Sequence, residues 1–120
     1  MKRWQAFLLL ATCGLASAAP SPARPEIDAL LARLQASGCS FQRNGSWYDA
    51  AEARTHLLRK LEYLEDHGMV QTTEQFIERG GTGSSMSGKP YLVRCGNAAP
   101  VESKVWLTNE LKAVRATRAR

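Results

Sequence analysis

The chain has 120 residues, of which 44% are hydrophobic, and its formal net charge at neutral pH is +5. This length is enough for one small domain with a single core, small enough that a covalent cross-link would matter to its stability. Between residues 26 and 112 ten Lys or Arg stand against eleven Asp or Glu, so the body is near neutral and we expect no clustered basic face of the kind that a nucleic-acid partner requires.

Residues 1–19 predict a signal peptide, because a short positive start leads into an apolar run to Leu15 and then into small residues at 16–19. The run of about a dozen residues is shorter than the roughly 20 that span a bilayer, so we expect no transmembrane segment in the mature chain. The expected location is periplasmic or secreted. Since Leu10-Ala11-Thr12-Cys13 resembles the box at which bacterial lipoproteins are cut, a lipoprotein anchored through Cys13 is the alternative.

Two cysteines, Cys39 and Cys95, remain once the leader is removed. In an oxidising compartment such an even pair predicts a disulfide. A redox or metal-binding pair is the alternative, but the chain has neither a C-x-x-C spacing nor further thiols. We therefore predict one disulfide and no metal site.

The first ordered segment is expected after a spacer. Residues 20–25 include three prolines and predict an extended stretch. The domain, residues 26–115, then begins with a helix from Glu26 that ends at Gly38. The apolar residues of this helix recur at the i, i+3, i+4 and i+7 positions of one face: Ile27, Leu30, Leu31 and Leu34.

A hairpin and the longest helix are expected next. The Asn-Gly pair at 44–45 stands between two short β-prone runs and predicts a hairpin over residues 39–48. Asp49, followed three residues later by a glutamate, predicts the N-terminus of a helix over about residues 50–67. Gly68 is expected to end this helix.

The second half of the chain predicts shorter elements. Thr72 repeats the capping pattern ahead of a short helix, and residues 80–88 are so rich in Gly and Ser that they predict a loop. A strand at 91–95 and a last helix over about 102–115 follow, with a basic tail at 116–120. The predicted fold class is α+β: three main helices and one short helix packed on a small antiparallel sheet.

The glycine-rich loop contains an incomplete phosphate-binding motif. Residues 83–89 match the first seven positions of a P-loop, but Pro90 stands where a Ser or Thr hydroxyl should meet Mg²⁺. A P-loop also joins a strand to a helix, whereas this loop is expected to join a helix to a strand. Two interpretations remain: a loop that holds a small anion or sugar with Lys89, and a flexible connector.

Glu52, His56 and Lys60 recur every four residues and form a polar stripe along the longest helix. Support of the helix by i,i+4 pairs explains this stripe without any reaction. As an alternative, His56 is the candidate catalytic residue, with Glu52 orienting its ring. His56 and His67 would lie about 16 Å apart along the helix, too far to share a zinc ion.

Several of these pieces form an ordered set of motifs. They are Phe41-Gln42-Arg43-Asn44-Gly45, Tyr48 to Lys60 with His56-Leu57, Phe76-Ile77, Ser84 to Tyr91 and Trp106-Leu107. In this order they resemble the YfeK-like family of small exported bacterial proteins, over about residues 26–115. The chain departs from the family at 80–83, where glycines replace a less glycine-rich helix end. Because the family is a domain of unknown function, the resemblance implies export and one α+β domain, without a mechanism.

These motifs concentrate at the Asn-Gly turn, the stripe of His56 and the Ser/Gly loop, and we expect the three to lie on one side of the fold. The predicted binding residues are Asn44, His56, Lys60, Ser84, Ser85, Ser87 and Lys89. The alternative is that each motif satisfies a local structural need.

The sequence favours a non-enzymatic binding or interaction module of the bacterial cell envelope, with an envelope protein, a glycan or a small anion as partner and no cofactor. The alternative is an envelope hydrolase or glycan-acting enzyme that uses His56 and a loop serine. Such an enzyme requires a concave pocket in which His56 lies within hydrogen-bond reach of a hydroxyl or carboxyl group.

Overall fold

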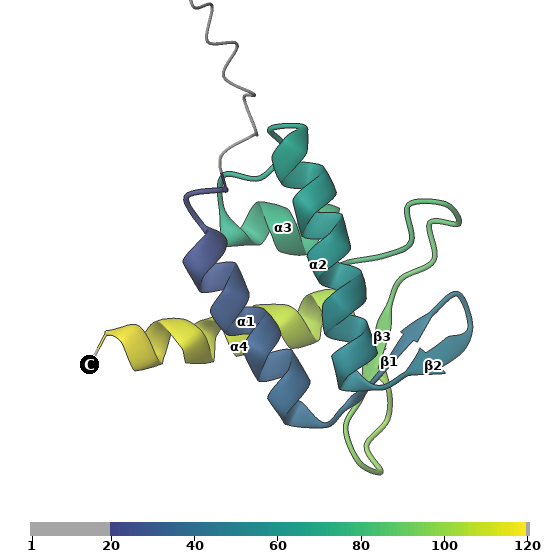
Figure 1. The fold of residues 1–120 in the computed structure, drawn as a ribbon. Helices are drawn as coiled ribbons and strands as arrows, with labels where there is room; N and C mark the ends of the chain where they lie inside the picture. Colours follow the sequence, from purple (N-terminus) through teal and green to yellow (C-terminus); the bar gives the residue numbers. More distant parts are fainter. Residues whose placement is uncertain (1–19, 120) are drawn as a thin grey trace, which may run out of the picture.

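The structure is a computed structural model that describes residues 20–119, so the predicted leader with Cys13 and the last residue of the predicted tail lie outside the described residues. Four helices and a four-stranded antiparallel sheet confirm the predicted α+β fold (Figure 1). In chain order the elements are α1 (Arg24–Ser37), β1 (Ser40–Arg43), β2 (Ser46–Tyr48), α2 (Ala50–Asp66), α3 (Thr73–Arg79), β3 (Leu92–Arg94), β4 (Val101–Glu102) and α4 (Ser103–Arg118). None of the helices within 20–119 combines the length and the apolar character that crossing a membrane requires.

The sheet has the order β2-β1-β3-β4, in which the sequence-distant strands β1 and β3 form the centre. The predicted hairpin is confirmed: Asn44 and Gly45 have φ values of 50° and 82°, as a two-residue turn requires. β1 and β3 pair with Ser40 opposite Arg94. The next pair outward is Cys39 and Cys95, which form the predicted disulfide with a Cα–Cα distance of 4.4 Å. The disulfide therefore continues the β1–β3 ladder.

The local signals for the two middle helices are also confirmed. The Asp49 side chain accepts a hydrogen bond of 2.8 Å from the Glu52 N–H at the start of α2. Thr72 and Gln75 form a complete capping box at the start of α3. Each of these bonds satisfies an N–H group that the first turn of a helix leaves free.

α1 begins at Arg24, two residues before the predicted start at Glu26, so the helix takes up part of the predicted spacer 20–25. Ser21, which also belongs to that stretch, is buried, and its backbone N–H donates a 2.7 Å hydrogen bond to the carboxylate of Glu65. The same carboxylate accepts from Arg24 at 2.6 Å. The ordered fold therefore includes Ser21, because a buried acid on α2 holds the backbone there.

At the other end of the chain, α4 runs to Arg118, three residues beyond the predicted end at residue 115 and into the predicted tail. Arg115 and Arg118 both form ion pairs with Glu26 on α1. These contacts hold the last turn of α4 against α1. β4 was not predicted, because a two-residue strand leaves too short a pattern to detect.

The core lies where α1, α2, α3 and one face of the sheet meet, and a smaller apolar cluster joins α1, α3 and α4. α2 contacts α1 along one side and β1 along another (Figure 1). The sheet contributes Phe41 and Val93 to the main cluster, Tyr91 joins it from just before β3, and α2 contributes Leu57 and Leu61. The packing of α2 against α1 and the sheet therefore fixes the position of the α2 face that looks towards the hairpin and the loop 80–90.

Candidate functional site

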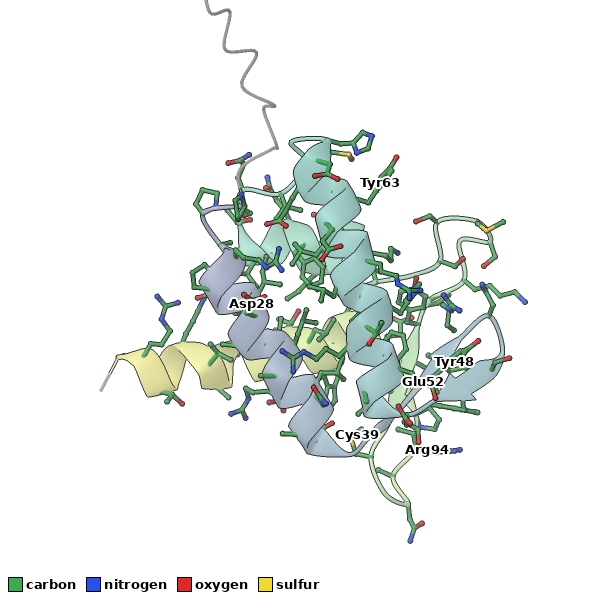
Figure 2. All side chains as sticks on the ribbon, viewed as in Figure 1. Asp28, Cys39, Tyr48, Glu52, Tyr63 and Arg94 are labelled. Atoms are coloured by element: carbon green, nitrogen blue, oxygen red, sulfur yellow. A yellow bond between two sulfur atoms is a disulfide. The ribbon has the colours of Figure 1, made fainter. Side chains whose placement is uncertain are left out.

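The predicted binding residues belong to three segments that meet beside α2: the β1–β2 turn, the middle of α2 and the loop 83–91. In Figure 2 the labelled residues Glu52 and Tyr63 lie on the side of α2 that faces the hairpin and this loop. Hydrogen bonds between side chains connect the three segments, as described below.

His56 connects α2 to the sheet through both of its ring nitrogens. Nδ1 lies 2.7 Å from Nη1 of Arg43, and Nε2 lies 3.0 Å from the hydroxyl oxygen of Tyr91. Arginine only donates hydrogen bonds, so Nδ1 is the acceptor and the ring proton is on Nε2. Nε2–H then donates to the Tyr91 hydroxyl. Glu52 does not orient the ring, because Arg43 and Tyr91 occupy both nitrogens.

This environment keeps His56 neutral. Burial lowers the pKa of His56 from 6.5 to about 4, and the positive charges of Arg43, Lys60 and Arg59 contribute in the same direction. A proton on Nδ1 would also face a guanidinium that only donates. His56 is therefore a neutral hydrogen-bonding group at physiological pH.

Lys60 lies one turn further along α2 and reaches the loop. Its ammonium donates to the Gly83 carbonyl at 2.8 Å and to the Tyr91 hydroxyl at 3.1 Å. Burial, and then the charge of Arg43, lower the pKa of Lys60 below its ordinary value. Burial raises the pKa of Tyr91, so its phenol is neutral at physiological pH. The Tyr91 oxygen thus accepts one hydrogen bond from His56 and one from Lys60.

The Ser/Gly loop is an ordered turn fastened to the hairpin. The Ser84 hydroxyl accepts from the backbone N–H groups of Met86 and Ser87 at 3.2 and 3.3 Å. The Ser84 carbonyl accepts from the Gly88 N–H at 2.9 Å. Asn44 at the tip of the hairpin donates to the Ser84 hydroxyl at 3.4 Å and accepts from the Ser87 hydroxyl at 2.6 Å. Most amides of this loop are occupied within the protein and do not form an open cradle for an anion.

The structure brings together five of the seven predicted binding residues through these bonds: Asn44, His56, Lys60, Ser84 and Ser87. Ser85 lies beside a hollow that His56 and Lys60 also line. Lys89 is exposed, and only its backbone is placed by the cluster, through an N–H bond to Ser87.

Three further residues belong to this site but were not among the predicted binding residues: Arg43, Arg59 and Tyr91. Arg43 and Tyr91 lie inside the Arg-Asn-Gly and Lys-Pro-Tyr motifs that carry the resemblance, so a signal for them was present. Arg59 follows no pattern of its own and is found only from its place on α2, beside the same hollow as His56.

Among the described residues, the cations of this site have no acidic partner. Within residues 20–119 the ion pairs are made by Arg24, Arg33, Arg115 and Arg118. No carboxylate of the described residues lies within 4.0 Å of the charged groups of Arg43, Arg59 or Lys60. Arg43 instead lies over the ring of Tyr48, with 5.1 Å from its Cζ to the ring centroid.

A hollow of about 380 Å³ opens between the hairpin and α2, next to these cations. Its walls come from β1, β2 and α2, and its charged lining residues are Arg43, Arg59 and a single acid, Glu52. This volume falls within the range of small ligand sites, about 300–1,000 Å³. The site therefore combines a concave surface with unpaired positive charge.

The chain was compared with known proteins. A family model described as a family of unknown function (DUF5329) matches residues 21–115. The chain is 39% identical over 66 residues to a protein of Salmonella typhimurium strain LT2 that is named "Uncharacterized protein YfeK". The aligned region covers 54% of this chain and 53% of that protein, so the chain spans about half the length of the relative. No solved structure matches the chain.

Proposed function

We propose a function from the geometry of the site, because the chain belongs to the DUF5329 family, for which no function is known. The proposed function is that of a non-enzymatic binding module of the bacterial cell envelope, which holds an acidic group of its partner. The partner is an envelope protein, a glycan or a small anion. The binding surface is the hollow beside α2 that Arg43 and Arg59 line, together with Lys60 of the neighbouring hollow.

One observation carries this proposal: positive charges stand at a partly buried surface without a counter-charge. The Lys60 ammonium bears a desolvation cost, seen in its lowered pKa, that no carboxylate of the described residues offsets. A bound carboxylate or phosphate would supply that counter-charge through strong, charge-assisted hydrogen bonds. Elsewhere among the described residues four arginines already have such partners: Arg24, Arg33, Arg115 and Arg118.

The geometry gives less support to the alternative of a hydrolase. His56 does lie within reach of a hydroxyl beside a hollow, but that hydroxyl belongs to the buried Tyr91 and accepts its hydrogen bond. A general base at neutral pH needs a pKa near 7 and a free nitrogen, whereas His56 has a pKa of about 4 and both nitrogens engaged. These features favour a binding role for the cluster.

Export to the periplasm, with removal of residues 1–19, is part of the proposal and is supported by the Cys39–Cys95 disulfide, because such bonds persist in oxidising compartments. N-terminal sequencing of the protein from a bacterial periplasmic fraction is expected to give a start near Ala19 or Pro20. Recovery of a lipid-modified Cys13 in the membrane fraction would instead make the protein a lipoprotein.

NMR titration with glucuronate, and with glucose as its uncharged counterpart, tests the proposed acid site. Glucuronate is expected to shift the backbone signals of α2 around His56, Arg59 and Lys60, and glucose is not. Arg59→Gln should weaken binding of glucuronate about tenfold, since it removes one charged hydrogen-bond donor.

Arg54→Gln is the matched control, because Arg54 lies on the same helix but donates to Gln35 of α1. This variant removes the same charge and should leave the affinity for glucuronate unchanged. Equal effects of Arg54→Gln and Arg59→Gln, or an equal response to glucose, would contradict an acid site beside α2.

A further inference from the structure

A second hollow lies further along α2, next to the hollow beside the hairpin. The first is lined on α2 by residues from Ala51 to Arg59, and the second, of about 450 Å³, by residues from His56 to Leu64. His56 and Arg59 line both hollows, so the two lie next to each other along α2. At a rise of 1.5 Å per residue, the combined groove extends about 20 Å along the helix.

The residues that line this groove recur on one face of α2. Glu52, His56, Arg59 and Tyr63 follow each other at the i, i+4, i+7 and i+11 positions, which place side chains above one another along a helix. Figure 2 agrees, since Glu52 and Tyr63 lie on the same side of α2, near opposite ends of the helix. A ligand that fills the groove is therefore elongated.

Charge is unevenly distributed along the groove. Its lining contains Arg43, Arg59, Lys60 and Arg79, against the single acid Glu52. Arg79 donates to the Met69 carbonyl and, like the other three, takes part in no ion pair within residues 20–119. Cations thus follow one another along the groove, which suits a chain with repeated negative charges.

The remaining lining suits sugars better than an acidic peptide. Tyr48 lines the first hollow and Tyr63, which is 60% exposed, the second, so each offers an aromatic ring with a polar tip. Thr55 and Ser85 add hydroxyl groups. An extended peptide is usually held by backbone bonds to a free sheet edge, and much of this groove is walled by helix side chains instead.

We propose that this groove binds a linear acidic polysaccharide, a chain of carboxylated sugars that contacts the cations of both hollows at once. The inference rests on the proposed function and specifies its partner. Carboxylates of successive sugars meet Arg43, Arg59 and Lys60, while Tyr48 and Tyr63 contact the sugar rings near the two ends. Affinity should therefore increase with the length of the chain until the groove is filled.

Calorimetric titration of the full protein with oligogalacturonides tests this, with a disaccharide compared with an octasaccharide. The octasaccharide is expected to bind at least about tenfold more tightly, because several charged contacts form together. Its affinity should fall as salt is raised, since the contacts are ionic. Tyr63→Ala should weaken the octasaccharide several-fold and leave the disaccharide nearly unchanged if the disaccharide is held by the first hollow. Arg54→Gln is again the control.

Each of the other possible results contradicts a different part of the proposal. Equal affinities for disaccharide and octasaccharide would overturn the polysaccharide groove and leave the acid site intact. Tighter binding of an oligoglutamate of the same length would replace the polysaccharide with an acidic protein partner. Equally tight binding of a neutral maltooligosaccharide would show that the cations of the groove do not determine the affinity. Absence of binding by glucuronate and by every acidic probe would overturn the proposed function itself.

Discussion

Loss of the Cys39–Cys95 disulfide is expected to lower the free energy of unfolding by about 4 kcal/mol. The bond closes a loop with a sequence separation of 56 residues, so its removal returns much conformational freedom to the unfolded chain. That is a large share of the stability of a small domain. Urea unfolding of the Cys39→Ser, Cys95→Ser double variant, compared with the unmodified protein, measures the difference.

The double variant avoids a lone thiol, and reduction of the unmodified protein with dithiothreitol provides an independent measurement of the same loss. Dithiothreitol treatment of the double variant is the control, because that variant has neither cysteine of this bond left to reduce. Unfolding midpoints that coincide in oxidised and reduced protein would show that the disulfide contributes no stability.

Acidification from pH 6.5 towards 4 is expected to destabilise the fold through His56. The pKa of His56 is about 4 in the folded protein, whereas its ordinary value is 6.5. Between these two pH values the unfolded chain therefore binds more protons than the folded one. The contribution of neutral His56 to the free energy of unfolding is fully present above pH 6.5 and is lost as the pH falls towards 4. The shift corresponds to about 3 kcal/mol, and solvent screening of the partly exposed ring reduces the expected loss to about 2 kcal/mol.

Denaturant unfolding at a series of pH values checks this prediction, with His56→Gln as the variant that cannot titrate. The slope of stability against pH between 6.5 and 5 should be smaller in His56→Gln than in the unmodified protein. Glu26, whose pKa is lowered by its hydrogen bond to Arg115, loses its contribution only at lower pH. His67→Gln is the control, and an equal change of slope in both variants would refute the role of His56.

Much of the fold was predictable because its signals are local. The Asn-Gly pair sets its turn through positive φ values, and Asp49 and Thr72 each set a helix start by accepting a hydrogen bond from the N–H three residues on. The disulfide was predictable because only two cysteines follow residues 1–19, the predicted leader. Such features depend on neighbours in the sequence, so they can be recognised without the tertiary structure.

The chemistry of the site was less predictable, because its partners come from distant parts of the chain. His56 was predicted as a site residue, but Arg43 and Tyr91, which fix its tautomer, lie 13 and 35 positions away in the sequence. Helical spacing alone suggested Glu52 as the residue that orients His56. Such spacing carries no information about partners outside the helix, such as Arg43 and Tyr91. The start of α1 was misplaced for the same reason, since Glu65 lies 44 residues away from Ser21.

The bond between Glu65 and Ser21 constrains how this sequence can vary. Glu65 accepts the backbone N–H of residue 21, which every amino acid except proline possesses. Pro20 and Pro22 flank this position, so a stretch rich in proline must leave one place for another residue. The Ser21 hydroxyl, which accepts from the Ala23 N–H, narrows the choice further to small polar residues. Homologues that retain an acid at position 65 should therefore vary freely on either side of residue 21 while excluding proline from it.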